Sequence, residues 1–91
     1  MSGVVARHLV IHGRVQGVWF RASVRDAARA RGVSGWAANR ADGTVEAHLE
    51  GPADAVAEVE RFCGQGPPRA QVTSVDARDA EPSGAAGFET R

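Results

Sequence analysis

The sequence predicts an α+β fold of the ferredoxin-like class, in which an antiparallel sheet carries two helices on one face. Segments with strand-like alternation enclose two segments in which apolar residues recur at helical spacing. Their order along the chain is β-α-β-β-α-β, which is the order of the split β-α-β motif. A short segment near the C-terminal end is a candidate for one further strand.

The length and composition of the chain indicate one small globular unit. Its 91 residues suffice for a single domain, which we expect to span residues 1–91. Hydrophobic residues make up 43% and charged residues 24%, values typical of folded proteins. No apolar run resembles a signal peptide or a membrane span. The single cysteine, Cys63, cannot form an internal disulfide, so we expect a cytoplasmic protein.

The first strand and the first helix are predicted from a change of period. In "RHLVIHG" (residues 7–13), Leu9 and Ile11 lie on one side of an extended segment. From Phe20 the apolar residues recur at helical spacing along an alanine-rich segment, which we expect to end at Gly32.

A hairpin, a second helix and the last strands follow. Asp42-Gly43 is typical of a hairpin turn between strands at residues 35–40 and 44–51. Pro52 suits the first turn of the second helix. The apolar stripe of that helix is Val56, Val59, Phe62 and Cys63. Residues 70–78 are predicted to form a strand, and residues 88–91 the short final one.

The charges are distributed unevenly along the chain. All eleven basic residues are arginines, which excludes a mechanism based on a lysine nucleophile or Schiff base. Residues 1–40 hold seven arginines and one acid, a balance of +6, whereas residues 41–91 hold four arginines and ten acids, a balance of −6. An anionic ligand is therefore expected near the first half. Three arginines are interpreted instead as a solvated face of the first helix: Arg25, Arg29 and Arg31.

The connection "GRVQGVWFR" (residues 13–21) has the features of an anion-binding loop. It leads into a helix N-terminus, where unpaired N–H groups and partial positive charge favour anions. Gly13 and Gly17 permit backbone conformations that turn successive N–H groups toward one centre. Arg21 adds a planar, permanently charged donor. The pattern alone is common, and it lacks the Gly-Lys-Ser/Thr of the nucleotide P-loop.

This loop, followed by "GWAANRADGTVEAHLEG" (residues 35–51) and "GPPRAQV" (residues 66–72), resembles the acylphosphatase family. The resemblance extends from about residue 8 to residue 75, and more loosely to the C-terminal end. It implies hydrolysis of acyl phosphates to a carboxylate and inorganic phosphate, without a metal or a cofactor. It implies a small-molecule substrate rather than nucleic acid or membrane, and we expect a monomer. The physiological acyl phosphate is not indicated.

The resemblance also implies roles for individual residues. By position, Arg21 matches the arginine that holds the phosphate, and Asn39 matches the asparagine that orients the attacking water. The main chain of the loop corresponds to the phosphate-binding segment, with these residues: Val15, Gln16, Gly17, Val18, Trp19 and Phe20. Ala37 and Thr90 depart from the family pattern, since a bulkier apolar residue is usual at position 37 and an apolar residue at position 90.

Two other functions are consistent with the same topology. A non-catalytic anion-binding domain needs only the fold and the loop. A nucleic-acid-binding module would need aromatic residues on the open face of the sheet, where the sequence places His8, Val10, His12, Thr44, Glu46, His48 and Glu50.

Several remaining polar and aromatic residues have simpler interpretations. Phe20 and Cys63 are assigned to the core, and Trp19 to the mouth of the loop. The residues interpreted as exposed polar positions are His8, His12, His48, Glu46, Glu50, Glu58 and Glu60.

Overall fold

The computed structural model describes residues 3–91, so the first two residues of the predicted 1–91 unit lie outside the described residues. The elements are β1 (Val4–Arg14), α1 (Phe20–Ala30), β2 (Ser34–Asn39), β3 (Val45–Pro52), α2 (Ala53–Gln65), β4 (Gln71–Ala80) and β5 (Phe88–Thr90). The predicted β-α-β-β-α-β order and the α+β ferredoxin-like fold are therefore confirmed, and the short final strand is present.

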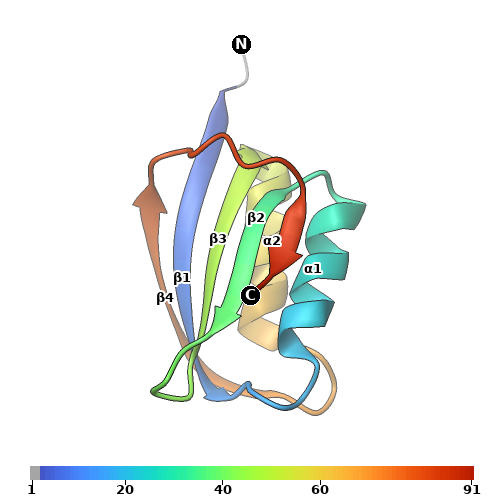
Figure 1. Ribbon diagram of the computed structural model, residues 1–91, viewed down its shortest axis with the longest axis vertical. Helices are drawn as coiled ribbons and strands as arrows, with labels where there is room; N and C mark the ends of the chain where they lie inside the picture. The colour runs from blue at the N-terminus through green and yellow to red at the C-terminus, as the bar shows by residue number, and fades with distance from the viewer. Residues whose placement is uncertain (1–2) are drawn as a thin grey trace.

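The five strands form one sheet in the order β4-β1-β3-β2-β5. The first four strands pair antiparallel, as predicted, whereas β5 pairs parallel with β2, with Gly35 opposite Phe88. The sheet is therefore mixed rather than wholly antiparallel. Figure 1 shows the reason: after β4 the chain crosses the upper end of the sheet and descends between β2 and α1.

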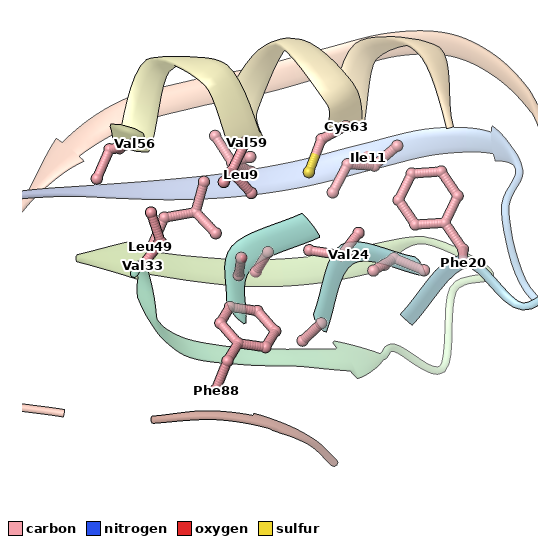
Figure 2. Close-up of a cluster of buried hydrophobic side chains, with 14 of the residues drawn as sticks. Leu9, Ile11, Phe20, Val24, Val33, Leu49, Val56, Val59, Cys63 and Phe88 are labelled. Atoms are coloured by element: carbon pink, nitrogen blue, oxygen red, sulfur yellow. The ribbon is translucent and has the colours of Figure 1, made fainter. Parts of the chain in front are cut away.

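Both helices lie on one face of the sheet. The helix α1 packs against β2 and β5, while α2 packs against β1, β3 and β4. Figure 2 shows the apolar side chains that fill the space between the helices and the sheet. The alternation predicted for β1 is confirmed, because Leu9 and Ile11 are fully buried and pair with Ala47 and Val45 of β3. Among residues 3–91, no helix has the length and hydropathy needed to cross a membrane.

The open face of the sheet is less exposed than the sequence predicts. His48 is only 8% exposed and Glu50 only 4% exposed, so their interpretation as exposed polar residues is wrong. The ring of Trp36 stacks on His48, with the ring centroids 6.2 Å apart. Residues of the β4–β5 connection cover Glu50, whose carboxylate accepts hydrogen bonds from the main-chain N–H groups of Ser83 (2.9 Å) and Gly84 (3.1 Å).

Other polar residues of the sheet form pairs. Nε2 of His8 lies 2.7 Å from Oε2 of Glu46, and both side chains are partly buried. Nε2 of His12 lies 3.0 Å from Oδ2 of Asp76 on β4. These pairs occupy the open face that a nucleic-acid-binding module would use for aromatic stacking.

Four expectations at and near α2 have different outcomes. Pro52 ends β3 and precedes the helix, rather than lying in its first turn, because β3 continues directly into α2. Glu60 is half-buried and accepts a hydrogen bond from Nε of Arg7 (2.9 Å), so its interpretation as exposed is wrong. Glu58 is exposed, and Cys63 is fully buried, both as predicted.

Candidate functional site

Two connections meet at one end of the sheet. The β1–α1 connection (residues 15–19) and the β2–β3 connection (residues 40–44) both lie at the lower end in Figure 1. The pairing of β1 and β3 places Ile11 opposite Val45, and the pairing of β2 and β3 places Asn39 opposite the same residue. The end of β2 is therefore two strands away from the end of β1, beside the N-terminus of α1.

A pocket of about 490 Å³ opens at this end of the molecule. Six of the eight predicted site residues line it: Val15, Gly17, Trp19, Phe20, Arg21 and Asn39. Ala22, Arg25 and Thr90 line it as well. The arginine and the asparagine, 18 positions apart in the sequence, therefore share one cavity.

Arg21 is placed by the first turn of α1. The preceding residue, Phe20, is buried in the core and fixes the start of the helix against the sheet. Arg21 itself is half-buried, and its Nη1 donates a hydrogen bond to the main-chain oxygen of Arg91 at 2.6 Å. This contact holds the guanidinium beside the segment that follows β5.

Asn39 is the last residue of β2. Since side chains alternate along a strand, Asn39 lies on the same face as the buried Ala37, which is the face that the helices cover. Asn39 lies beyond the edge of the core and is itself exposed. Its side chain thus comes to the helical side of the sheet, where the pocket opens.

The N–H groups at the start of α1 are not capped. The residue before the helix, Trp19, makes no side-chain capping bond, and the first turn contains no acid. In contrast, the first turn of α2 contains Asp54. Among the main-chain hydrogen bonds outside helices and strands in residues 3–91, none has an N–H of residues 15–19 as its donor. These groups therefore offer an anion unpaired donors and partial positive charge.

The β1–α1 connection (residues 15–19) contains two residues with positive φ. Gly17 has φ 75°, and Trp19 has φ 64°, a left-handed conformation that is uncommon for any residue other than glycine. Trp19 is 79% exposed and still lines the pocket. This agrees with its predicted place at the loop mouth.

Two residues of the predicted binding loop do not line the pocket. The side chain of Gln16 turns toward the β2–β3 connection, where Nε2 donates to the main-chain oxygens of Arg40 (2.8 Å) and Thr44 (2.9 Å). The side chain of Val18 packs against the core. Any contribution of these two residues to anion binding must come from their main chain.

One charged residue of the pocket lies outside the predicted site. The interpretation of Arg25 as part of a solvated face is wrong, because this residue is half-buried and lines the pocket. Arg29 and Arg31 are exposed, as predicted. The signal that could have found Arg25 is its spacing, since residues four apart on a helix share a face and Arg21 is the fourth residue before it.

The titratable groups near the site have structural explanations. The carboxylate of Asp42 accepts hydrogen bonds from the hydroxyl (2.6 Å) and the N–H (3.0 Å) of Thr44, which lower the pKa of Asp42 and close the turn after Asn39. Burial raises the pKa of Cys63 to about 12, so this thiol is unsuited to act as a nucleophile. Residues 3–91 contain no group of three His, Cys, Asp or Glu side chains arranged to hold a metal ion.

Comparison with known proteins identifies the family of this chain. The sequence pattern of the family described as Acylphosphatase matches residues 7–90. An acylphosphatase from Natronomonas pharaonis is 48% identical over 91 residues, which are all of this chain and 99% of that protein. The chain belongs to the acylphosphatase family. The enzyme class indicated by the sequence motifs is thereby confirmed, namely a hydrolase.

Solved structures of the acylphosphatase family have the same fold. An acylphosphatase from Coxiella burnetii has a TM-score of 0.93 at 32% identity, covering 97% of this chain and 93% of that one. An acylphosphatase from Bacillus subtilis has a TM-score of 0.92 at 33% identity, covering 96% of this chain and 98% of that one. The fold and the family assignment therefore agree.

Proposed function

We propose that this chain hydrolyses acyl phosphates, breaking the bond between the carboxyl oxygen and phosphorus to release a carboxylate and inorganic phosphate. The observation that carries the proposal is the shared pocket, in which Arg21, Asn39 and the uncapped start of α1 come together. Phosphoryl transfer depends mainly on positioning and on stabilisation of charge. This pocket supplies groups that can position the substrate and groups that can stabilise its charge.

The phosphate is held by the loop and by Arg21. The N–H groups of residues 15–20 donate to its oxygens, while the guanidinium neutralises charge and forms further hydrogen bonds. Gln16 and Val18 take part through their main-chain N–H groups alone, since their side chains point elsewhere. A carboxylate is a good leaving group, so its departure needs no acid catalyst.

The attacking water is oriented by Asn39. A neutral carboxamide accepts a hydrogen bond from water through its oxygen and donates another to the substrate through its nitrogen. The water oxygen attacks phosphorus, and the carboxylate leaves with the electron pair of the broken bond. The proton of the water passes to an oxygen of the substrate phosphate, so no side chain is required as general base.

The proposal extends to the setting of the reaction. Residues 1–91 act as one acylphosphatase-like domain, as a monomer, with a small-molecule acyl phosphate as substrate and without metal, cofactor or nucleic acid. Cytoplasmic location is part of the proposal, because the one cysteine, Cys63, is a buried free thiol that suits a reducing compartment.

Hydrolysis of benzoyl phosphate in the presence of a chelator tests the proposal. Arg21→Ala should raise both KM and the inhibition constant of inorganic phosphate about tenfold to a hundredfold, the effect of losing charge-assisted hydrogen bonds. Asn39→Ala should lower kcat about a hundredfold while phosphate inhibition changes little. Arg61→Ala, on the exposed side of α2, is the control for loss of one charge.

Three results would contradict the proposal. Normal hydrolysis by both site variants would contradict the roles assigned to Arg21 and Asn39. Loss of wild-type activity in the presence of the chelator would contradict a metal-independent reaction. Phosphate binding without any turnover in the wild-type protein would favour a non-catalytic anion-binding domain.

A further inference from the structure

Arg25 is a second cation in the pocket that the proposed reaction does not use. It follows Arg21 by four residues on α1, so the two side chains share one face of the helix about one turn apart, or roughly 5–6 Å. Both arginines line the cavity, and its nine lining residues include no acid. The side chain of Arg25 is 33% exposed, so it is partly buried and still accessible to a ligand.

The present partner of Arg25 holds it only weakly. Among residues 3–91, its recorded hydrogen bond is from Nε to Oδ1 of Asp26 at 3.2 Å. Asp26 is the next residue on the helix and its side chain is 69% exposed, so the two side chains do not face each other along the helix and the pair contributes little free energy. Arg21 and Arg29 differ, because their guanidinium groups donate to main-chain oxygens of Arg91 and Phe88.

Building on the proposed function, we propose that Arg25 binds a second anionic group on the acyl part of the substrate. The preferred substrate class is then acyl phosphates whose acyl group carries a further carboxylate or phosphate. With the reacting phosphate at Arg21 and the loop, the acyl group extends within the same cavity. Trp19 and Ala22, which also line it, can contact the carbon skeleton between the two charged ends.

Matched aromatic substrates test this inference. The 3- and 4-carboxybenzoyl phosphates carry the second anion at two fixed distances, and the corresponding carbamoylbenzoyl phosphates are neutral analogues of the same shape. In the wild-type protein we expect kcat/KM to be higher for at least one carboxylate than for its amide, with a ratio that falls as ionic strength rises. Arg25→Gln should lower that ratio about threefold to tenfold.

Two further variants complete the experiment. Arg25→Lys, which keeps the charge, should retain most of the preference for the carboxylate. Arg61→Gln removes one positive charge outside the pocket and should leave the ratio as in the wild type. Circular dichroism and thermal melting of each variant establish that it is folded before kinetic comparison.

The outcomes separate this inference from the proposed function. An equal change of kcat/KM for both members of each pair in Arg25→Gln, or the same ratio shift in Arg61→Gln, would overturn the role of Arg25. Absence of a salt-sensitive preference in the wild type would do the same. Absence of benzoyl phosphate hydrolysis by the wild-type protein would instead overturn the proposed function itself, and full hydrolysis by both Arg21→Ala and Asn39→Ala would overturn its assigned site.

Discussion

Gly35 lies where β2 and β3 approach too closely for a side chain. Its φ is 138°, and a Cβ atom built there would lie 1.8 Å from the carbonyl oxygen of His48 on the paired strand. The Cα atom of Gly35 and the oxygen of His48 belong to paired backbones. Neither can move without disturbing the hydrogen-bonded pairing of β2 and β3, at whose end Asn39 lies. A single hydrogen atom in place of a side chain therefore permits the register that positions the site.

Replacement of this glycine gives a prediction at the residue scale. Gly35→Ala should lower the free energy of unfolding by about 3 kcal/mol, which combines backbone strain with the clash. Gly43→Ala is the matched control, because Gly43 has φ 91° with open space around it and should lose only about 1 kcal/mol from strain. Urea denaturation of both variants makes the comparison, and equal losses would show that close packing at Gly35 is unimportant.

At the scale of elements, Gln16 connects the anion-binding loop to the β2–β3 hairpin. Its amide nitrogen donates to the carbonyl groups of Arg40 and Thr44, at 2.8 Å and 2.9 Å. These two residues flank the turn that follows Asn39, and the N–H of Arg40 donates to the oxygen of Thr44 at 2.9 Å. The side chain therefore sets the separation between the loop that holds phosphate and the strand that carries the carboxamide.

A change at Gln16 should thus affect turnover through Asn39. Gln16→Met keeps the length of the side chain but removes both hydrogen bonds, and we expect kcat to fall about tenfold with a smaller change in phosphate inhibition. In the Asn39→Ala background the same change should have little further effect on kcat. Fully additive losses in this double-mutant cycle would mean that Gln16 acts independently of Asn39.

At the scale of the whole molecule, Glu50 ties the β4–β5 connection to the sheet. The main chains of Ser83 and Gly84 and the hydroxyl of Ser83 donate to its carboxylate, and Nε2 of His48 lies 2.6 Å from it. This connection carries the chain from one edge of the sheet to the other, as Figure 1 shows. It thereby places β5 beside β2 and brings the main-chain oxygen of Arg91 to Arg21.

Low pH should reduce the free energy of unfolding, because it protonates the carboxylate of Glu50. Burial raises the pKa of Glu50, but hydrogen bonds from Ser83, His48 and Gly84 outweigh it and lower the pKa from 4.5 to about 2. Because the folded-state pKa is the lower one, the stabilisation is complete above about pH 4.5 and is lost as the pH falls toward 2. Unfolding free energies measured across this range should therefore decline.

The variant Glu50→Gln isolates this contribution. It should lose about 2 kcal/mol at pH 7, since charged hydrogen bonds are replaced by weaker ones, and its stability should depend less on pH below 4.5. Glu58→Gln, an exposed position on α2, is the control. A pH profile of Glu50→Gln that parallels the wild type would assign the acid sensitivity to other carboxylates.

Local patterns were sufficient to predict the elements and to indicate an anion-binding loop. The period of two around Leu9 and the helical spacing from Phe20 involve residues that are close in the sequence, so the sequence alone reveals them. The glycines and Arg21 of the loop are likewise neighbours in the sequence, whereas the role of Asn39 was implied only by the resemblance to the acylphosphatase family. Burial of Phe20 and Cys63 also followed, because each lies on the apolar stripe of its own helix.

Tertiary structure decided what depends on segments distant in sequence. Glu50 and His48 are buried because a loop more than thirty residues later crosses the sheet above Glu50 and Trp36 of another strand covers His48. The parallel pairing of β5 and the turn of Gln16 toward the hairpin arise in the same way. The sequence determined the elements and their chemical groups, since these are local properties. Which groups face one another was decided only when the chain closed into a sheet, because those contacts join residues with no common local pattern.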